Sequence, residues 1–248
     1  MMRKLPINSC LSLFVTLLLM AGSSHAQVVA TVANLSGVLT VRHADGKTKL
    51  LAVKSQIEQG DTLITENNTF ARLKFTDASE IVLRPGTEVR VDKFSFDQNK
   101  PEGDSLIINM IKGGMRSVSG LIGKRNRDVV QYVTPTATIG IRGTTWDAYQ
   151  VEPGTGSKDA AAEKSDQQRE PGLYVSVVDG KIVMSNAAGA SNFTAGQFGF
   201  VPNAASLPVI LPTNPGIKFS PPPAFTSAKS GVSKQSDKSA AASDCAVR

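Results

Sequence analysis

The feature that most constrains the fold is a series of short segments rich in β-branched and aliphatic residues, which begins at Val28 and is interrupted by turn residues roughly every 8–12 positions. In Phe70–Phe75, apolar residues alternate with Arg72 and Lys74, which is the period of a half-buried strand. Asp45-Gly46 tolerates the positive φ angles of a hairpin turn, and we interpret Asp179-Gly180 in the same way. The pattern predicts an all-β fold.

The N-terminal segment 1–26 has the features of a signal peptide. Arg3 and Lys4 precede a largely apolar run from Cys10 to Ala21, and small residues lead up to Ala26. A run of about 12 residues is short of the ~20 that span a bilayer, so cleavage is favoured over a retained membrane anchor. We therefore expect a periplasmic or secreted protein with no integral membrane span after cleavage.

The remaining chain divides into one domain and a tail. Residues 27–202 carry the β pattern, and within them residues 152–171 have the composition of a mobile loop. Residues 203–248 are first rich in proline and then dominated by Ser, Lys, Ala and Asp, with few side chains to bury. We expect a single β domain followed by a disordered tail.

Charge and cysteine usage narrow the class of protein. Removing Arg3 and Lys4 with the signal lowers the formal net charge from +6 to +4, and the chain has no concentrated basic stripe, so we expect no nucleic-acid partner. Cys10 leaves with the signal and Cys245 lies near the C-terminus, which precludes an intramolecular disulfide. The fold must depend on a hydrophobic core.

The inventory of reactive residues argues against an enzyme. After Ala26 the only histidine is His43, next to the predicted turn at Asp45. A Ser–His or Cys–His catalytic pair could therefore use no other histidine. We predict no catalytic residue, no metal and no cofactor. Two alternatives remain open: a calcium site at Asp77 or Asp179, and a hydrolase with two carboxylates near Trp146. The acids available to such a hydrolase are Asp61, Asp77, Glu80, Glu88, Asp92 and Asp147.

A group of basic residues surrounds Gly113-Gly114 and the predicted loop 120–128. Arginine in a loop on a rigid scaffold can recognise carboxylate or phosphate groups bidentately. The competing interpretation is a solvated surface. The candidate binding residues are Lys112, Arg116, Lys124, Arg125 and Arg127.

Four blocks, read in order, resemble the FecR domain family. They are Gly37–Val41 with Gly60–Thr65, the strand–turn–strand Phe70–Leu83, the segment Val133–Trp146, and Val177–Val183 with Ala195–Gln197. The third block is the most specific, since it is similar to the family's Thr-Pro strand and Arg-Gly-Thr-x-aromatic core. Ala78 stands where the family's turn has a glycine. The structural residues of the third block are Thr134, Pro135, Gly140, Arg142, Gly143, Thr144 and Trp146.

The resemblance implies an all-β domain, in a twisted β-solenoid-like or sandwich arrangement, outside the cytoplasmic membrane. In the founding regulators, such a domain receives a signal from a TonB-dependent receptor and passes it to a cytoplasmic segment that controls a sigma factor. Here the predicted signal peptide replaces that segment. We expect a non-catalytic binding or sensing domain for an envelope protein, with binding of an anionic polymer such as peptidoglycan or polysaccharide as the alternative. Arg142 is expected to be buried or half-buried and paired.

Overall fold

Strands dominate the structure, a computed structural model that describes residues 27–152, 169–222 and 225. They form two hydrogen-bonded ladders, sheet A and sheet B, which share strand β9 (Ser105–Val118). The all-β prediction is confirmed. The predicted signal peptide 1–26, most of the predicted loop 152–171 and the tail after residue 225 lie outside the described residues.

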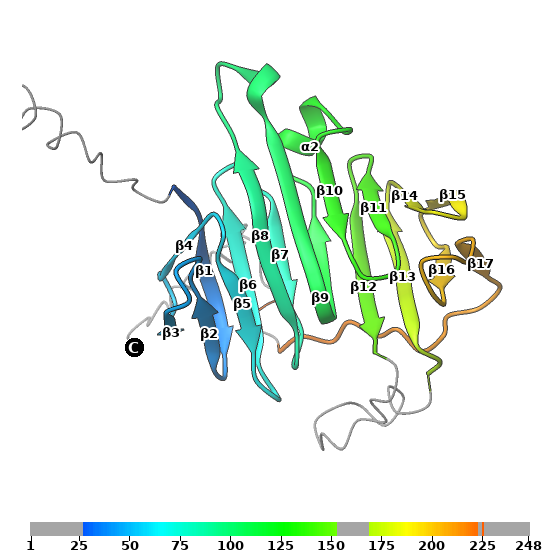
Figure 1. The fold of residues 1–248 in the computed structure, drawn as a ribbon, viewed down its shortest axis with the longest axis horizontal. Helices are drawn as coiled ribbons and strands as arrows, with labels where there is room; N and C mark the ends of the chain where they lie inside the picture. The colour runs from blue at the N-terminus through cyan, green and yellow to red at the C-terminus, as the bar shows by residue number, and fades with distance from the viewer. Residues whose placement is uncertain (1–26, 153–168, 223–224, 226–248) are drawn as a thin grey trace, which may run out of the picture.

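Each sheet runs from N-terminal strands on one side of β9 to C-terminal strands on the other (Figure 1). Sheet A has the order β4 (Gln56–Glu58), β1 (Val28–Ser36), β6 (Phe70–Phe75), β7 (Glu80–Leu83), β9, β12 (Thr145–Val151), β13 (Gly172–Asp179), β16 (Phe198–Val201), β17 (Val209–Leu211). Sheet B has the order β3 (Thr48–Leu51), β2 (Leu39–Arg42), β5 (Thr62–Thr65), β8 (Glu88–Ser95), β9, β10 (Val130–Val133), β11 (Thr138–Ile141), β14 (Lys181–Asn186), β15 (Gly189–Thr194).

Strand β9 passes from sheet B into sheet A at Gly113. Before this point the buried residues are Leu106, Ile108 and Met110, and after it they are Met115 and Ser117, so the inward-facing set changes from even to odd numbers. Gly113 has φ +83°, and a Cβ there would lie 2.5 Å from the Thr87 Cα. The bend predicted at Gly113-Gly114 is confirmed, and only glycine fits it.

The two predicted hairpin turns have different outcomes. β2 and β3 form an antiparallel hairpin around Asp45-Gly46, as expected. The prediction for Asp179-Gly180 is wrong, because β13 pairs with β12 and β16 in sheet A while β14 pairs with β11 and β15 in sheet B. Gly180, with φ +79°, turns the chain from one layer to the other.

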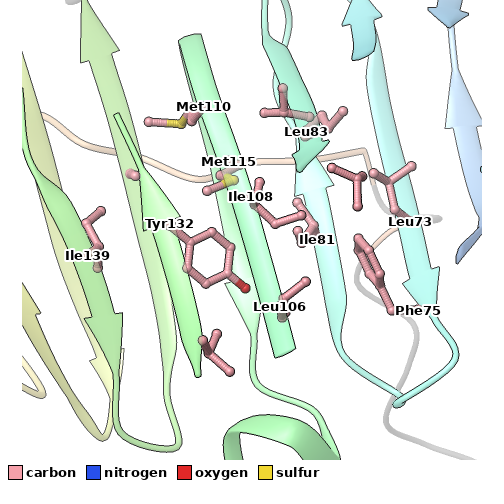
Figure 2. Packing of buried hydrophobic residues seen from close by; sticks show 14 of the residues in the cluster. Leu73, Phe75, Ile81, Leu83, Leu106, Ile108, Met110, Met115, Tyr132 and Ile139 are labelled. Carbon is pink, nitrogen blue, oxygen red and sulfur yellow. The ribbon is translucent and has the colours of Figure 1, made fainter. Parts of the chain in front are cut away.

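The core lies between the sheets and joins them into one sandwich. Figure 2 shows part of this cluster around β9, with Leu73 and Phe75 from β6 and with Tyr132 from β10. Tyr132 meets Trp146 of β12 edge to face, with ring centroids 4.8 Å apart, and both side chains are fully buried. The Tyr132 hydroxyl shares a 2.6 Å hydrogen bond with Ser117, and burial raises the Tyr132 pKa above its ordinary value.

Two short helices occur in the connections, η1 (Pro101–Gly103) and α2 (Leu121–Arg125). α2 lies in the segment 120–128 that the sequence predicted as loop. It forms part of the crossover that makes β10 parallel to β9. Asp77 is 1% exposed and accepts hydrogen bonds from Ser79 and the Ile122 N–H. The Asp77 carboxylate therefore has internal partners on both oxygens.

The ordered β structure continues past the predicted domain end at Pro202. β17 pairs with β16 in register from Phe198–Leu211 to Phe200–Val209. Beyond β17, Ile217 and Phe225 are buried against the domain. The first part of the Pro-rich segment is therefore packed, because its apolar side chains have a surface to cover.

Candidate functional site

The family-like Thr-Pro block forms the hairpin turn between β10 and β11. Thr134 is buried, and its Oγ1 accepts hydrogen bonds from the N–H groups of Thr136 (3.2 Å) and Ala137 (3.1 Å). Pro135 is exposed within the turn. The turn thus has a side-chain oxygen that satisfies two backbone donors, the usual advantage of threonine at this position.

The Arg-Gly-Thr block forms the corner at which the chain leaves β11 of sheet B and enters β12 of sheet A. Gly143 has φ +66°, and its carbonyl oxygen would lie 2.3 Å from a Cβ placed on Gly180. The Thr144 N–H donates to Ser119 Oγ at 2.9 Å. Two inter-layer corners, at Gly143 and Gly180, are therefore packed against each other.

The expectation that Arg142 is buried and paired is wrong. Arg142 follows the last residue of β11, where the strand has left the core, and its side chain is exposed. Its backbone N–H donates to the Lys181 carbonyl at 2.9 Å. Among the described residues, the guanidinium has no hydrogen bond or ion pair. It projects from a rigid corner and is available to a ligand.

Arg142 lines a shallow groove over the outer face of sheet B, where β10, β11 and β14 lie side by side. In the central row of the groove, Gln131 of β10 is opposite Gly140 of β11, and Gly140 is opposite Val183 of β14. A Cβ on Gly140 would meet nothing within 4 Å, so the missing side chain leaves open space. Gly140 therefore forms the floor of the groove.

The groove has a net positive charge and polar walls. Arg127 and Arg142 contribute two guanidinium groups, against one carboxylate from Asp128. Thr138 and Ser185 add hydroxyl groups. The volume is about 270 Å³, slightly below the ~300–1,000 Å³ of typical small-molecule pockets. The dimensions suit one acidic group presented by a larger partner.

The five basic residues predicted as a binding cluster do not form one surface. Arg127 lies in the groove, and Lys124 is exposed on α2. Arg125 donates to the carbonyls of Asp97 (3.0 Å) and Gln98 (3.1 Å), so it ties α2 to the loop after β8. Lys112 lies opposite Glu88 at the end of the β8–β9 ladder.

Arg116, the fifth of these residues, lies on sheet A. Its Nε and Nη2 donate to the two carboxylate oxygens of Asp147 at 2.6 and 2.8 Å. The guanidinium carbon is 4.1 Å from the centroid of the Phe219 ring. Proximity in the sequence did not translate into proximity in space, because β9 carries Arg116 into the other layer.

The acids considered for a hydrolase are occupied by other side chains. Ion pairs join Glu80 to Arg72, Glu88 to Arg42, Asp92 to Arg90 and Asp147 to Arg116. Asp77 has the internal partners described above. Trp146 is fully buried between the sheets, so it lines no cleft in which two of these acids could act.

His43 has a structural partner that its position beside a turn did not predict. Its Nδ1 lies 2.7 Å from Oδ1 of Asp61, which is 1% exposed, and Oδ2 of Asp61 accepts the Glu58 N–H at 2.9 Å. Ligand atoms of His43, Glu58 and Asp61 fall within 4.8 Å of one another, a spacing that one cation could bridge. Because both Asp61 oxygens already accept hydrogen bonds, we interpret the cluster as a structural tie between β2 and β5.

The site residues missed by the sequence argument are Gly140 as a floor and Arg142 as a free cation. A glycine in an otherwise apolar strand pattern is the signal that could have indicated a close approach by another group. No signal in the sequence places Arg127 and Arg142 on the same groove, since that placement depends on the pairing of β10 with β11.

Fold and groove together define a two-layered β domain with an open, arginine-bearing groove on one outer face. Residues 61–183 match the family model described as FecR protein. This match confirms the resemblance to the FecR family, and the matched residues extend from β5 into β14.

The chain also resembles solved structures, and no curated protein matches it. One similar structure is described as a cell surface anchoring domain, with 22% identity, a TM-score of 0.25, and coverage of 26% of this chain and 84% of that chain. Another, from Parabacteroides distasonis ATCC 8503, is described as a candidate anti-sigma factor. It has 14% identity and a TM-score of 0.42, and the alignment spans 60% of this chain and 58% of that one.

Across the part of the chain that the structure describes, no helix has the length and apolar character needed to cross a membrane.

Proposed function

We propose that this chain is a non-catalytic binding and sensing domain of the bacterial cell envelope, which recognises an acidic surface of a partner protein through Arg127 and Arg142. The match of residues 61–183 to the FecR family model supports a sensing or signalling domain. The observation that carries the proposal is the groove, where two guanidinium groups, unpaired within the described part of the chain, flank a floor made by Gly140. Guanidinium groups recognise carboxylates through paired hydrogen bonds.

The partner's contribution is one acidic side chain in an otherwise larger interface. The groove is small, and its polar side chains are arranged around a shallow floor rather than inside an enclosed cavity. Such a contact supplies specificity and a faster association rate, while the surrounding outer surface of sheet B supplies area. Export to the periplasm or the exterior, which the N-terminal sequence predicts, would bring the groove to envelope proteins.

The test is in-cell crosslinking of the tagged full chain, followed by mass spectrometry of the captured proteins. We expect one dominant partner, and at least tenfold less capture by the double variant Arg127→Glu/Arg142→Glu, which corresponds to about 1.4 kcal/mol or more. The matched control is Lys49→Glu/Lys100→Glu, which makes the same charge change at exposed residues outside the groove. Equal capture of the partner by both double variants would show that the groove does not bind it.

A second variant separates the groove's shape from its charge. Gly140→Val adds a side chain to the floor at a position where no atom lies within 4 Å of the new Cβ and the backbone is not in the positive-φ region. Valine also favours a strand more than glycine does. We expect unchanged or higher thermal stability together with reduced partner capture. Reduced stability with normal capture would contradict this.

Binding of an anionic envelope polymer is the second candidate, because Gln131, Thr138 and Ser185 offer hydroxyl and amide groups beside the two arginines. This function predicts cosedimentation with purified cell-wall sacculi that weakens as salt increases, since exposed charges are screened. Capture of sacculi without a protein partner would favour it over the leading proposal.

A further inference from the structure

The segment after β17, which we call the strap (residues 212–222 and 225), crosses the outer face of sheet A. It leaves the domain edge at Leu211 and runs back toward β6, and Figure 1 shows it in orange. No backbone–backbone hydrogen bond joins the described part of the strap to a strand of the sheet. The strap is therefore held by side chains of the sheet and not by strand pairing.

Two apolar anchors hold the strap, one near its middle and one at its C-terminal end. Ile217 is 6% exposed and packs with Val151 of β12 and Tyr174 of β13. Phe225 is 5% exposed, and its ring centroid lies 6.2 Å from that of Phe70 in β6. The anchors lie on opposite sides of β9, so the strap spans most of the width of the sheet.

Between and beside the anchors, arginines of the domain donate to carbonyl oxygens of the strap. Arg169 donates from Nε to the Pro215 carbonyl at 3.0 Å and from Nη2 to the Gly216 carbonyl at 2.5 Å. Arg84 donates from Nη1 to the Lys218 carbonyl at 3.0 Å. These contacts use backbone atoms of the strap and are independent of its side chains at the three positions.

Cation–π contacts complete the surface. The guanidinium of Arg116 lies over the Phe219 ring at 4.1 Å, and that of Arg72 lies 6.0 Å from the Phe225 ring. The Arg116 guanidinium is already fixed by both oxygens of Asp147. A cation held in place by its own carboxylate is a pre-organised platform for an aromatic side chain, which limits the entropy lost on binding.

The pattern is that of a receptor for an extended peptide: donors and cations belong to the face, while carbonyl groups, prolines and aromatic rings belong to the strap. A proline-rich segment suits such a surface because its backbone is already extended and its carbonyls are unpaired. We propose that the outer face of sheet A is a docking surface for an extended, proline- and phenylalanine-bearing segment of a partner protein, and that the strap occupies this surface in the free protein.

This surface is separate from the groove on sheet B, and it takes a ligand of different chemistry. The strap competes with the partner segment, so the apparent affinity is reduced in proportion to the fraction of molecules with an open face. Weakening the strap without changing the face should therefore strengthen binding in trans. This expectation distinguishes a docking surface from a simple cover.

The experiment uses a fluorescent synthetic peptide of residues 212–225 and the full-length protein, with binding followed by anisotropy. We expect Phe219→Ala/Phe225→Ala to bind the peptide at least tenfold more tightly than the unmodified protein. Lys218→Ala is the matched control, because the exposed Lys218 is held by its carbonyl group. It should behave like the unmodified protein. Absence of peptide binding by a folded double variant overturns the proposal.

A second measurement applies if the double variant does not fold. A protease site inserted between Pro212 and Thr213 of the full chain is cut after folding, and an excess of labelled peptide should then displace the cut strap. Retention of the cut strap overturns the proposal. Light scattering would detect dimers that exchange straps. Such dimers would also overturn the proposal, because the face would then bind the strap of a second copy and not a partner protein. Arg127→Glu/Arg142→Glu should leave peptide binding unchanged. A failure of the groove proposal can therefore be told apart from a failure of the docking-surface proposal.

Discussion

The outer faces of the two sheets use the same kind of residue in opposite ways. On sheet A, Arg116 is bound to Asp147 and stacked on Phe219 beneath the strap. On sheet B, Arg127 and Arg142 have no such partners among the described residues and border an open groove. The difference shows that the number of basic residues in a segment does not reveal a binding site. What matters is whether the fold provides each cation with an internal partner.

The largest expected effect separates the two kinds of arginine. Arg116→Ala leaves the nearly buried Asp147 without its cation, and we expect a loss of about 2 kcal/mol in the free energy of unfolding. This is less than the ~3–5 kcal/mol of a fully buried pair, because the Arg116 side chain is 29% exposed. Arg142→Ala should change stability by less than about 0.5 kcal/mol. Urea unfolding of both variants is the measurement. Equal losses in the free energy of unfolding would contradict the distinction between a paired and an unpaired arginine.

Two glycines test whether the two outer faces differ in the room they leave for an added side chain. A Cβ on Gly114 would lie 2.5 Å from Tyr149 Cδ2 and 3.0 Å from Arg84 Cδ on the face under the strap. Gly114→Ala should therefore cost about 1–2 kcal/mol, in the lower part of the ~1–3 kcal/mol range of overpacking. Gly140→Ala meets no atom and should raise stability by up to about 0.5 kcal/mol. Thermal melting of the two variants should move the midpoint in opposite directions, and a shared decrease would show that the groove floor is also packed.

The smallest effect calibrates the others. Ala78, in the turn between β6 and β7, is exposed and has φ +63°, a conformation that glycine adopts without steric cost. Ala78→Gly should stabilise the domain by only about 0.3 kcal/mol in urea unfolding, because relief of the positive-φ strain is largely offset by the conformational entropy that glycine loses on folding. Because it touches neither outer face, it should leave partner capture and strap-peptide binding unchanged. A change in either would mean that stability alone influences those assays.

Local patterns predicted most strands but not their layer. Alternation identified Phe70–Phe75, and Asp45-Gly46 marked a true hairpin, because both signals depend on neighbouring residues. The same Asp-Gly signal failed at residues 179–180, where Gly180 instead makes a corner between sheets. A turn residue specifies a backbone angle and says nothing about which strands then pair.

The site was less predictable than the fold for the same reason. The sequence argument selected Arg127 and expected Arg142, which interrupts an apolar strand, to be buried or half-buried and paired. The structure ends that strand at Ile141 and exposes Arg142. The tie between His43 and Asp61 and the contact of Arg116 with Phe219 join residues far apart in the chain. Such contacts arise from tertiary packing, which periodicity does not record.

The shared strand β9 has a consequence for the order of folding. Within the described residues, β1–β8 lie on one side of it in both sheets and β10–β17 lie on the other. A chain that emerges from the ribosome N-terminus first can assemble half of the sandwich as far as β9 before the second half exists. Each later strand then pairs at an existing edge, so the N-terminal half can serve as a template for the C-terminal half.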